Sequence, residues 1–318
     1  MRCSIGRETK EAQEMASTME GDTIAQRTLA AEFRVFGIGA HTGQPVCVTV
    51  YPGEPDTGIC FLRSDQPPSR GLILARWSNV VSAQYSADIG NHAGVGVRMV
   101  EHLLAALRLA GVDNALVVLN GPEVPALDGS AAQFLAQIER TGTLEQDAPA
   151  RTIVLLRPVE LREGDRYVRL TPSLNPRLTV TIDYPGTPLG MQSIATAWDR
   201  DLLKREIAPA RTFGFTADRA AELGSAVVVD GEHIRNLDSL RFPDEFVRHK
   251  VLDAIGDLYL AGWPIRANYD GFKPGHALNL RLLSKLMGQQ SDAWVLVPSR
   301  NVKRSPCGPR MALLPVSV

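Results

Sequence analysis

The order of the hydrophobic patterns constrains the fold of this chain more than any other feature. Short segments in which every second residue is apolar, typical of strands, come before longer segments with helical periodicity, and this order occurs twice. In the first half, the expected elements are strands around 33–35, 46–50, 58–62 and 114–119, and helices over 99–111 and 130–142. In the second half, they are strands over 153–161, 167–170, 178–182, 226–229 and 293–297, and helices over 243–262 and 274–287. Strands followed by helices in each half predict two layered α+β units.

Residues typical of helix caps and turns indicate where the helices and the domains begin and end. Gly111 follows the first helix where a C-terminal cap is common, and Ser130 with Gln133 forms a capping box for the second. The stretch Glu145–Ala150, which ends in Ala-Pro-Ala, is the best candidate linker. Residues 1–21 mix charged with small residues and lack an apolar core segment, which indicates a disordered leader. We therefore expect an N-terminal α+β domain over 22–147 and a C-terminal α+β domain over 148–318.

Composition excludes several classes of protein. The chain has 34 Lys and Arg residues against 35 Asp and Glu, which argues against a protein whose role is to bind nucleic acid. No apolar run approaches the length that a transmembrane segment needs. The four cysteines, Cys3, Cys47, Cys60 and Cys307, are scattered, so neither a disulfide framework nor a thiolate zinc site is indicated. A reduced, cytoplasmic protein is the expectation.

The first segment that carries chemistry is the predicted helix around Glu101 and His102. Apolar residues lie on both sides of this helix, which predicts that it is buried on both sides. A buried carboxylate needs a cation, a metal or a proton as its partner. Taken alone, the segment also fits a histidine satisfied in the core beside an exposed glutamate.

The second such segment is the predicted helix over 243–262. His249, Asp253 and Asp257 follow one another at four-residue spacing, so they share one face of the helix. A His and an Asp one helical turn apart can bind the same metal ion through a nitrogen and an oxygen. A solvated surface with salt bridges is the alternative interpretation of this face.

Two histidines and one aspartate from two helices would form a three-ligand site. Together, His102, His249 and Asp253 match the pattern of catalytic zinc sites, which keep a fourth position open for water. Glu101 adjoins one of these residues, where a general base acting on that water is expected. The same donor set also accepts Fe²⁺ or Co²⁺.

Longer motifs occur in one order between about Arg27 and Val297. They are GAHTG at 39–43, VEHL at 100–103, VPALDGSA at 124–131, ARTFGF at 210–215, DEFVRHK at 244–250, DAIGD at 253–257 and GHALN at 275–279. In this combination they resemble the bacterial UDP-3-O-acyl-N-acetylglucosamine deacetylase family.

The resemblance implies two α+β domains, each a sheet layered with helices, which face each other across the active site. It also implies a cytoplasmic zinc amidohydrolase, and we expect the protein to be a monomer. Its substrate would be a UDP-linked N-acetyl amino sugar, and the reaction the committed step of lipid A biosynthesis.

The resemblance assigns the metal ligands and the two proton-transfer residues. His102, His249 and Asp253 would bind Zn²⁺, and Glu101 would be the general base that deprotonates the metal-bound water. His276 would be protonated, stabilise the oxyanion and give its proton to the leaving amine.

The remaining roles also come from the resemblance. Asp257 would orient His276, and the Thr212 hydroxyl would help to hold the oxyanion. Phe213 would pack on the sugar. Lys250 and Lys273 would meet the diphosphate and nucleotide end, where point charges suit an anionic group.

One departure from the family leaves the substrate open. Only 24 residues separate Phe215 from Leu240, whereas family members carry a longer segment that helps to enclose the acyl chain. A shorter segment removes less apolar area from water, so a paralogous zinc deacetylase for a substrate with a short or absent acyl chain is an alternative. A weaker alternative is a non-catalytic binding protein on the same scaffold. It is disfavoured because all three predicted metal ligands and the predicted base are present. A serine or cysteine hydrolase is disfavoured because no glycine-flanked serine elbow occurs.

Overall fold

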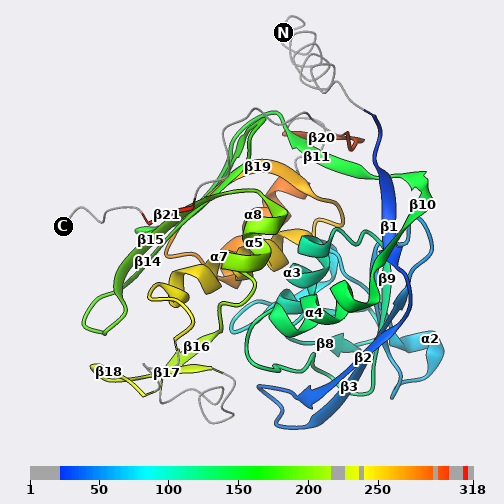
Figure 1. Cartoon of the computed structure of the whole chain (residues 1–318), viewed down its shortest axis with the longest axis horizontal. Coiled ribbons are helices and arrows are strands. Elements are labelled where there is room, and N and C mark those ends of the chain that lie inside the picture. Colours follow the sequence, from blue (N-terminus) through cyan, green and yellow to red (C-terminus); the bar gives the residue numbers. More distant parts are fainter. Residues whose placement is uncertain (1–21, 216–225, 236–239, 289–292, 301–310, 314–318) are drawn as a thin grey trace, which may run out of the picture.

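The computed structural model describes residues 22–215, 226–235, 240–288, 293–300 and 311–313. The predicted leader over 1–21 lies outside this part of the chain, as does much of the segment between Phe215 and Leu240. Figure 1 shows helices in the middle of the molecule, with the sheet of the first half on one side and the sheet of the second half on the other. The predicted α+β fold class is confirmed. Among the described residues, no helix is both long and apolar enough to span a membrane.

The main sheet of the first half has the strand order β2-β3-β9-β4-β5. Its strands are β2 (Phe33–Ile38), β3 (Pro45–Pro52), β4 (Ile59–Arg63), β5 (Leu72–Leu74) and β9 (Ala115–Leu119). Val46, Val48 and Val50 are buried because alternate side chains of a strand point to the same face, here the core. The predicted strands are confirmed. The short helix α2 (Pro68–Gly71) and β5 were not predicted.

Two helices of the first half pack on the inner side of this sheet. The helix α3 (Glu101–Ala110) ends at Gly111, whose φ of 76° confirms the predicted left-handed cap. The helix α4 (Ala132–Thr141) begins differently from the prediction, because its N-cap is Ala131, which has no polar side chain to act as a cap. The predicted capping box is therefore wrong: the Ser130 hydroxyl donates to Asp128 and accepts from the Ala132 N–H.

A small sheet leads into α3. Its strands β6 (Val80–Ser82), β7 (Asp88–Gly90) and β8 (Gly96–Val97) follow the 3₁₀ helix η1 (Trp77–Asn79). None of them was predicted, because three-residue strands give too few alternations to recognise. Ala87, the residue before β7, connects this sheet to the start of α3, since its carbonyl accepts a hydrogen bond from the Val100 N–H.

The main sheet of the second half has the order β12-β13-β19-β14-β15-β21, and β11 joins it by pairing with β19 and β20. These strands are β11 (Arg151–Leu155), β12 (Val159–Glu163), β13 (Arg166–Pro172), β14 (Arg177–Tyr184), β15 (Gly190–Ala197), β19 (Ile265–Phe272), β20 (Trp294–Pro298) and β21 (Met311–Leu313). The single strand predicted over 153–161 is in fact β11 and β12. Pro158 separates them, because proline has no N–H for a ladder, and the N–H groups of Leu156 and Arg157 bond to the Ala293 carbonyl.

The helices of the second half lie on the inner face of this sheet. They are α5 (Arg200–Glu206), α7 (Glu245–Tyr259) and α8 (His276–Met287). The last two confirm the predicted helices, each a few residues shorter than expected. A small sheet of β16 (Phe213–Phe215), β17 (Val227–Asp230) and β18 (His233–Ile234) lies beyond them and contains the strand predicted over 226–229.

A two-stranded ribbon joins the halves. The strand β1 (Ala25–Leu29) pairs antiparallel with β10 (Thr143–Pro149). The predicted linker at 145–150 is therefore mostly β-strand, and β10 crosses the boundary expected at residue 147. The division into two domains stays a prediction.

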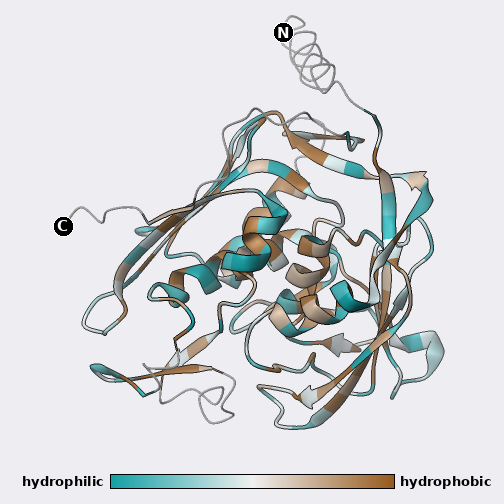
Figure 2. Ribbon diagram, viewed as in Figure 1, coloured by the Kyte–Doolittle hydropathy of each residue, from teal (hydrophilic) through white to brown (hydrophobic). Residues whose placement is uncertain are grey.

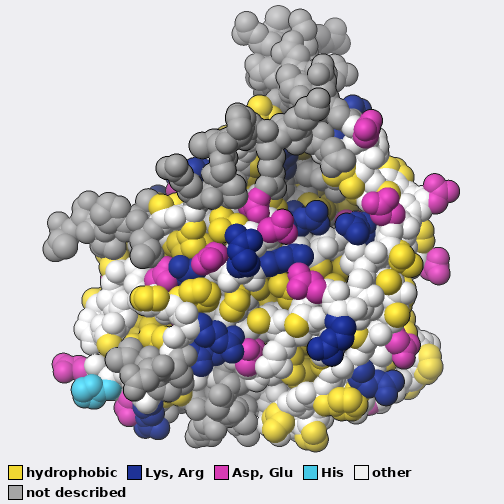
Figure 3. Space-filling model, in the orientation of Figure 1, with side chains coloured by type: hydrophobic (Ala, Val, Ile, Leu, Met, Phe, Trp, Pro, Cys, Tyr) yellow, Lys and Arg dark blue, Asp and Glu magenta, His cyan; other side chains and the backbone are white. Residues whose placement is uncertain are grey.

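The helices α3 and α7 pack against each other in the middle of the molecule, and Figure 2 shows α3 as largely hydrophobic. Leu103, Leu104 and Leu107 of α3 are fully buried. The two helices approach so closely at Gly256 that a Cβ there would lie 2.1 Å from the Glu101 carbonyl oxygen. Glycine is therefore required at this crossing, which lies at the turn of α3 that carries Glu101 and His102. On the outside, basic and acidic side chains intermingle on the face shown in Figure 3, in keeping with the balanced composition.

Candidate metal centre

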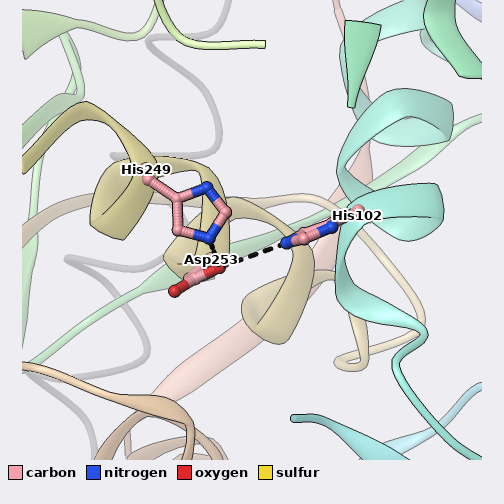
Figure 4. A group of neighbouring side chains, drawn as sticks. All are labelled: His102, His249 and Asp253. Carbon is pink, nitrogen blue, oxygen red and sulfur yellow. Dashed lines mark ion pairs between the residues drawn. The ribbon is translucent and has the colours of Figure 1, made fainter. Parts of the chain in front are cut away.

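The predicted metal ligands meet where α3 and α7 cross. His102 lies on the first turn of α3, and His249 and Asp253 lie on consecutive turns of α7; all three are buried. Figure 4 shows both imidazoles directed at the carboxylate. The Asp253 Oδ1 atom is 3.2 Å from Nε2 of His249 and 3.7 Å from Nε2 of His102. One donor atom from each residue lies within 4.8 Å of the others, which is the geometry of a site that can hold one metal ion.

The hydrogen bonds leave the inward-facing donor atoms available. His249 Nδ1 lies 3.0 Å from the Ala210 carbonyl oxygen, which only accepts, so Nδ1 carries the proton and Nε2 presents its lone pair. Asp253 Oδ2 accepts a hydrogen bond of 2.7 Å from Lys250 Nζ. Within the described residues, Asp253 Oδ1 has no hydrogen-bond partner. A buried, unpartnered carboxylate oxygen beside two imidazoles fits a divalent cation.

The protonation states also suit metal binding. Burial lowers the pKa of His102, which favours the neutral imidazole. Burial alone would raise the pKa of Asp253, but the neighbouring basic side chains, with Lys250 hydrogen-bonded to the carboxylate, outweigh it and hold that pKa well below its usual range. Neutral imidazole and ionised carboxylate are the forms that bind metal ions.

Glu101 is buried beside this group, so the alternative of an exposed glutamate is wrong. Its Oε2 accepts a hydrogen bond of 3.0 Å from the Ala87 N–H, and its Oε1 lies 3.7 Å from His276 Nε2. Burial raises the pKa of Glu101 to about 8. A carboxylate that takes up a proton near neutral pH has the affinity that a general base needs.

His276 and Asp257 form the predicted pair. The Nδ1 atom of His276 lies 2.9 and 3.0 Å from the two carboxylate oxygens of Asp257. Asn279 donates to the same carboxylate, and the Tyr269 hydroxyl donates to Asn279. Burial lowers the pKa of His276, but the neighbouring carboxylates, Asp257 first, outweigh it and raise the pKa to about 10. This favours the imidazolium form of His276 at neutral pH, and its Nε2 lies 3.7 Å from Glu101 Oε1.

Two predicted substrate residues lie next to the ligands. The Phe213 ring makes an edge contact with the His249 ring at 6.4 Å between centroids. Lys250 Nζ lies 5.3 Å from the centre of the Phe213 ring and also donates a hydrogen bond to Asp253. Thr212 is held through its backbone, because its N–H donates to the Gly129 carbonyl at 2.7 Å. The roles predicted for these side chains toward substrate stay predictions.

Lys273 lies in a separate group of charges. Its Nζ atom is 2.6 Å from an Asp165 oxygen and 2.8 Å from an Asp183 oxygen. The Arg166 guanidinium donates to the Lys273 carbonyl, so a second cation that was not predicted lies at the same place. Hydrogen bonds to Asp165 and Asp183 raise the pKa of Lys273, which keeps it charged. Its predicted contact with a phosphate stays a prediction.

Other supporting groups were not predicted either. Asn279 had a signal, because it follows His276 by three residues on a helix and so shares its face. The ion pair between Arg211 and Glu245 joins residues 34 positions apart, and its parts lie in two of the motifs. The Ala210 carbonyl had no signal, since any residue carries a backbone carbonyl.

Comparison with known proteins gives consistent matches. The family model described as UDP-3-O-acyl N-acetylglycosamine deacetylase matches residues 26–288. A UDP-3-O-acyl-N-acetylglucosamine deacetylase of Myxococcus xanthus is 43% identical over 295 residues, which are 89% of this chain and 92% of that protein. Proteins of the same name from Phenylobacterium zucineum and Campylobacter jejuni are 40% and 39% identical, over 85% and 86% of this chain and 95% of each relative.

Proposed function

This chain belongs to the UDP-3-O-acyl N-acetylglycosamine deacetylase family, and from that premise we propose that its reaction takes place at the centre formed by His102, His249 and Asp253. The enzyme hydrolyses the N-acetyl amide of UDP-3-O-acyl-N-acetylglucosamine, a reaction of lipid A biosynthesis. The observation that carries the assignment of the site is the convergence of three buried donor atoms, one of them an unpartnered carboxylate oxygen among the described residues.

The donor set supports a divalent metal ion, and we infer that it is zinc. Enzymes of this family are metalloenzymes, and two imidazoles with one carboxylate are a common catalytic zinc set. His102, His249 and Asp253 would hold the ion. When bound, Zn²⁺ would polarise the acetamide carbonyl and make hydroxide accessible near neutral pH.

Glu101 acts as the general base. Its Oε2 is fixed by the Ala87 N–H, so Oε1 is the atom that takes a proton from the attacking water. The water oxygen forms the new bond to the acetamide carbon. Burial makes this carboxylate more basic, and a bound divalent cation would favour its ionised form, the form that accepts a proton.

His276 acts as the general acid. Its Nδ1 is held by Asp257, so Nε2 is the atom that gives its proton to the amide nitrogen as the carbon–nitrogen bond breaks. The products are acetate and the free amino sugar nucleotide. Before that step, the imidazolium and the Thr212 hydroxyl stabilise the negative charge that develops on the carbonyl oxygen. Phe213 packs on the sugar, and Lys250 and Lys273 face the diphosphate.

A paired turnover assay on the zinc-loaded protein tests this function. UDP-3-O-acyl-N-acetylglucosamine with a long acyl chain is compared with plain UDP-N-acetylglucosamine, and loss of the acetyl group is followed by mass. We expect strong preference for the acylated substrate. Equal or faster turnover of the unacylated sugar would point to the paralogous deacetylase, and no turnover of either would contradict the proposal. A monomeric state and a cytoplasmic location stay predictions.

A further inference from the structure

A fully buried carboxylate that the reaction does not use lies at the first residue of α7. Glu245 accepts hydrogen bonds from the backbone N–H of Arg211 at 2.9 Å and from that of Arg241 at 2.7 Å. The Arg211 guanidinium adds two more through Nε at 2.8 Å and Nη2 at 3.1 Å. Burial would raise the pKa of Glu245, but the hydrogen bonds from Arg211 outweigh it, so the pKa is lowered and the carboxylate stays ionised.

The segment that Glu245 holds lies along the same helix as the metal ligands. The Ala210 carbonyl meets Nδ1 of His249, and the Phe213 ring makes an edge contact with the Phe246 ring at 5.2 Å between centroids. Arg211 lies between these two contacts, and Glu245 binds it through both backbone and side chain. Residues 210–213 are thus attached to three positions in the first two turns of α7.

The same segment is attached on its other side to a turn of the first half. The Thr212 N–H donates to the Gly129 carbonyl, and the Ala131 N–H donates to the Ala208 carbonyl. Gly129 has a φ of 81°, a backbone conformation that favours glycine and that defines this turn. Arg241, whose N–H binds Glu245, also reaches the turn through a 2.7 Å ion pair with Asp128. Glu245 therefore lies where helix α7, the 210–213 segment and the 128–131 turn meet.

We propose that Glu245 is a positioning residue for the active site: through Arg211 it fixes the Ala210 carbonyl on His249 and the Thr212 backbone beside the metal centre. This inference rests on the proposed function for its effect on turnover, but its effect on metal binding does not. If Arg211 moved, Ala210 would lose its place on Nδ1 of His249, and the ring would no longer be held with Nε2 toward Asp253. Loss of such an outer partner weakens metal binding by about 10- to 100-fold.

The chain offers a matched control in the adjacent residue. Asp244 is also a buried carboxylate at the start of α7, and its Oδ1 accepts a 2.6 Å hydrogen bond from Arg248. Arg248 in turn binds Glu206 at the end of α5, so this ion pair secures the helix without involving residues 210–213. Glu245→Gln and Asp244→Asn each remove one buried negative charge from the same helical turn. Only Glu245→Gln removes a charged partner of the 210–213 segment.

The experiment compares these two variants with the wild-type chain. Zinc affinity is measured by competition with a chelator, the Co²⁺-loaded proteins are examined by visible absorption, and turnover is measured at saturating zinc. We expect Glu245→Gln to bind zinc at least about 10-fold more weakly, to alter the Co²⁺ spectrum and to lower kcat about 10-fold, while Asp244→Asn stays within about 2-fold. Thermal unfolding midpoints show whether the two variants are equally destabilised.

Two results would overturn the inference: wild-type zinc affinity and Co²⁺ spectrum in Glu245→Gln, or an equal change in Asp244→Asn. If Glu245→Gln does not fold, Arg211→Lys replaces it, because lysine keeps the charge but not the two-pronged contact. The same zinc and Co²⁺ results are then expected from Arg211→Lys. If the wild-type enzyme shows no turnover, the proposed function fails, and the metal measurements still decide the role of Glu245.

Discussion

Two buried carboxylates on α7, Glu245 and Asp253, lie about two turns apart and have opposite surroundings. Glu245 accepts four hydrogen bonds from Arg211 and Arg241. Asp253 accepts one on Oδ2, while its Oδ1 faces two imidazoles and has no hydrogen-bond partner in the described part of the chain. Where the chain supplies all the partners of a buried acid, the acid secures the fold. Where the described residues leave one oxygen without a partner, a bound cation would supply it.

The largest effect is expected from removing Asp253, the carboxylate whose Oδ1 has no hydrogen-bond partner among the described residues. Asp253→Ala takes away one of three donors, so we expect loss of stoichiometric zinc and of measurable turnover. Metal content after dialysis and turnover of the acylated substrate measure this. Full zinc content in the variant would show that Asp253 is not a ligand.

The next largest effect is expected from the base. Glu101→Ala removes the proton acceptor but no ligand, so turnover is expected to fall by about 10²- to 10⁴-fold with zinc content unchanged. Turnover and metal content are measured on the same preparation. Unchanged turnover would contradict the assignment of Glu101, and loss of zinc would make it part of the metal site.

The pH dependence of turnover tests the role of a third buried acid on α7, Asp257. Its carboxylate is bound by His276 and Asn279, and it helps to raise the pKa of His276 to about 10. Because the general acid works when protonated, turnover is lost as pH rises through that pKa. Asp257→Asn removes the charge that raises the pKa, so the alkaline limb of the kcat/KM profile moves to lower pH. An alkaline limb at the wild-type pH in this variant would show that His276 is not the titrating acid.

The smallest effect is on stability and concerns Glu245. Its pKa is lowered in the folded state, so its contribution is fully present above the unfolded pKa and is lost as pH falls through the folded one. We expect Glu245→Gln to lower the free energy of unfolding by about 1–3 kcal/mol at pH 7. The deficit should shrink on acidification, and urea unfolding at pH 7 and at pH 4 measures it. A deficit that is the same at both pH values would contradict the ion-pair interpretation.

The residues that meet at the candidate metal centre could be picked out from the sequence because they lie on long helices. The spacing of His249 and Asp253 placed both on one face, and the apolar sides of the first helix indicated that Glu101 and His102 are buried. The partners of these residues were harder to predict. Ala210 contributes only a backbone carbonyl, and Lys250 binds Asp253 at a three-residue spacing that also fits an ordinary surface pair.

The fold, too, was predictable where an element is long enough to show a periodic pattern. Helices α7 and α8 and the strands with clear alternation were predicted, whereas β6, β7 and β8 are too short to give a periodic signal. Ser130 met the pattern of a capping box, yet its hydroxyl bonds to Asp128, because the left-handed turn at Leu127 and Gly129 brings the two side chains together. Local pattern predicts an element, and tertiary contacts decide how it begins.

The role of a metal ion in the reaction is tested most directly by returning metal to chelator-treated wild-type enzyme in the presence of UDP-3-O-acyl-N-acetylglucosamine. Our expectation is that the metal-free protein stays folded and releases no acetate, and that turnover returns in proportion to added Zn²⁺ up to about one equivalent. Undiminished turnover by the metal-free protein would contradict it.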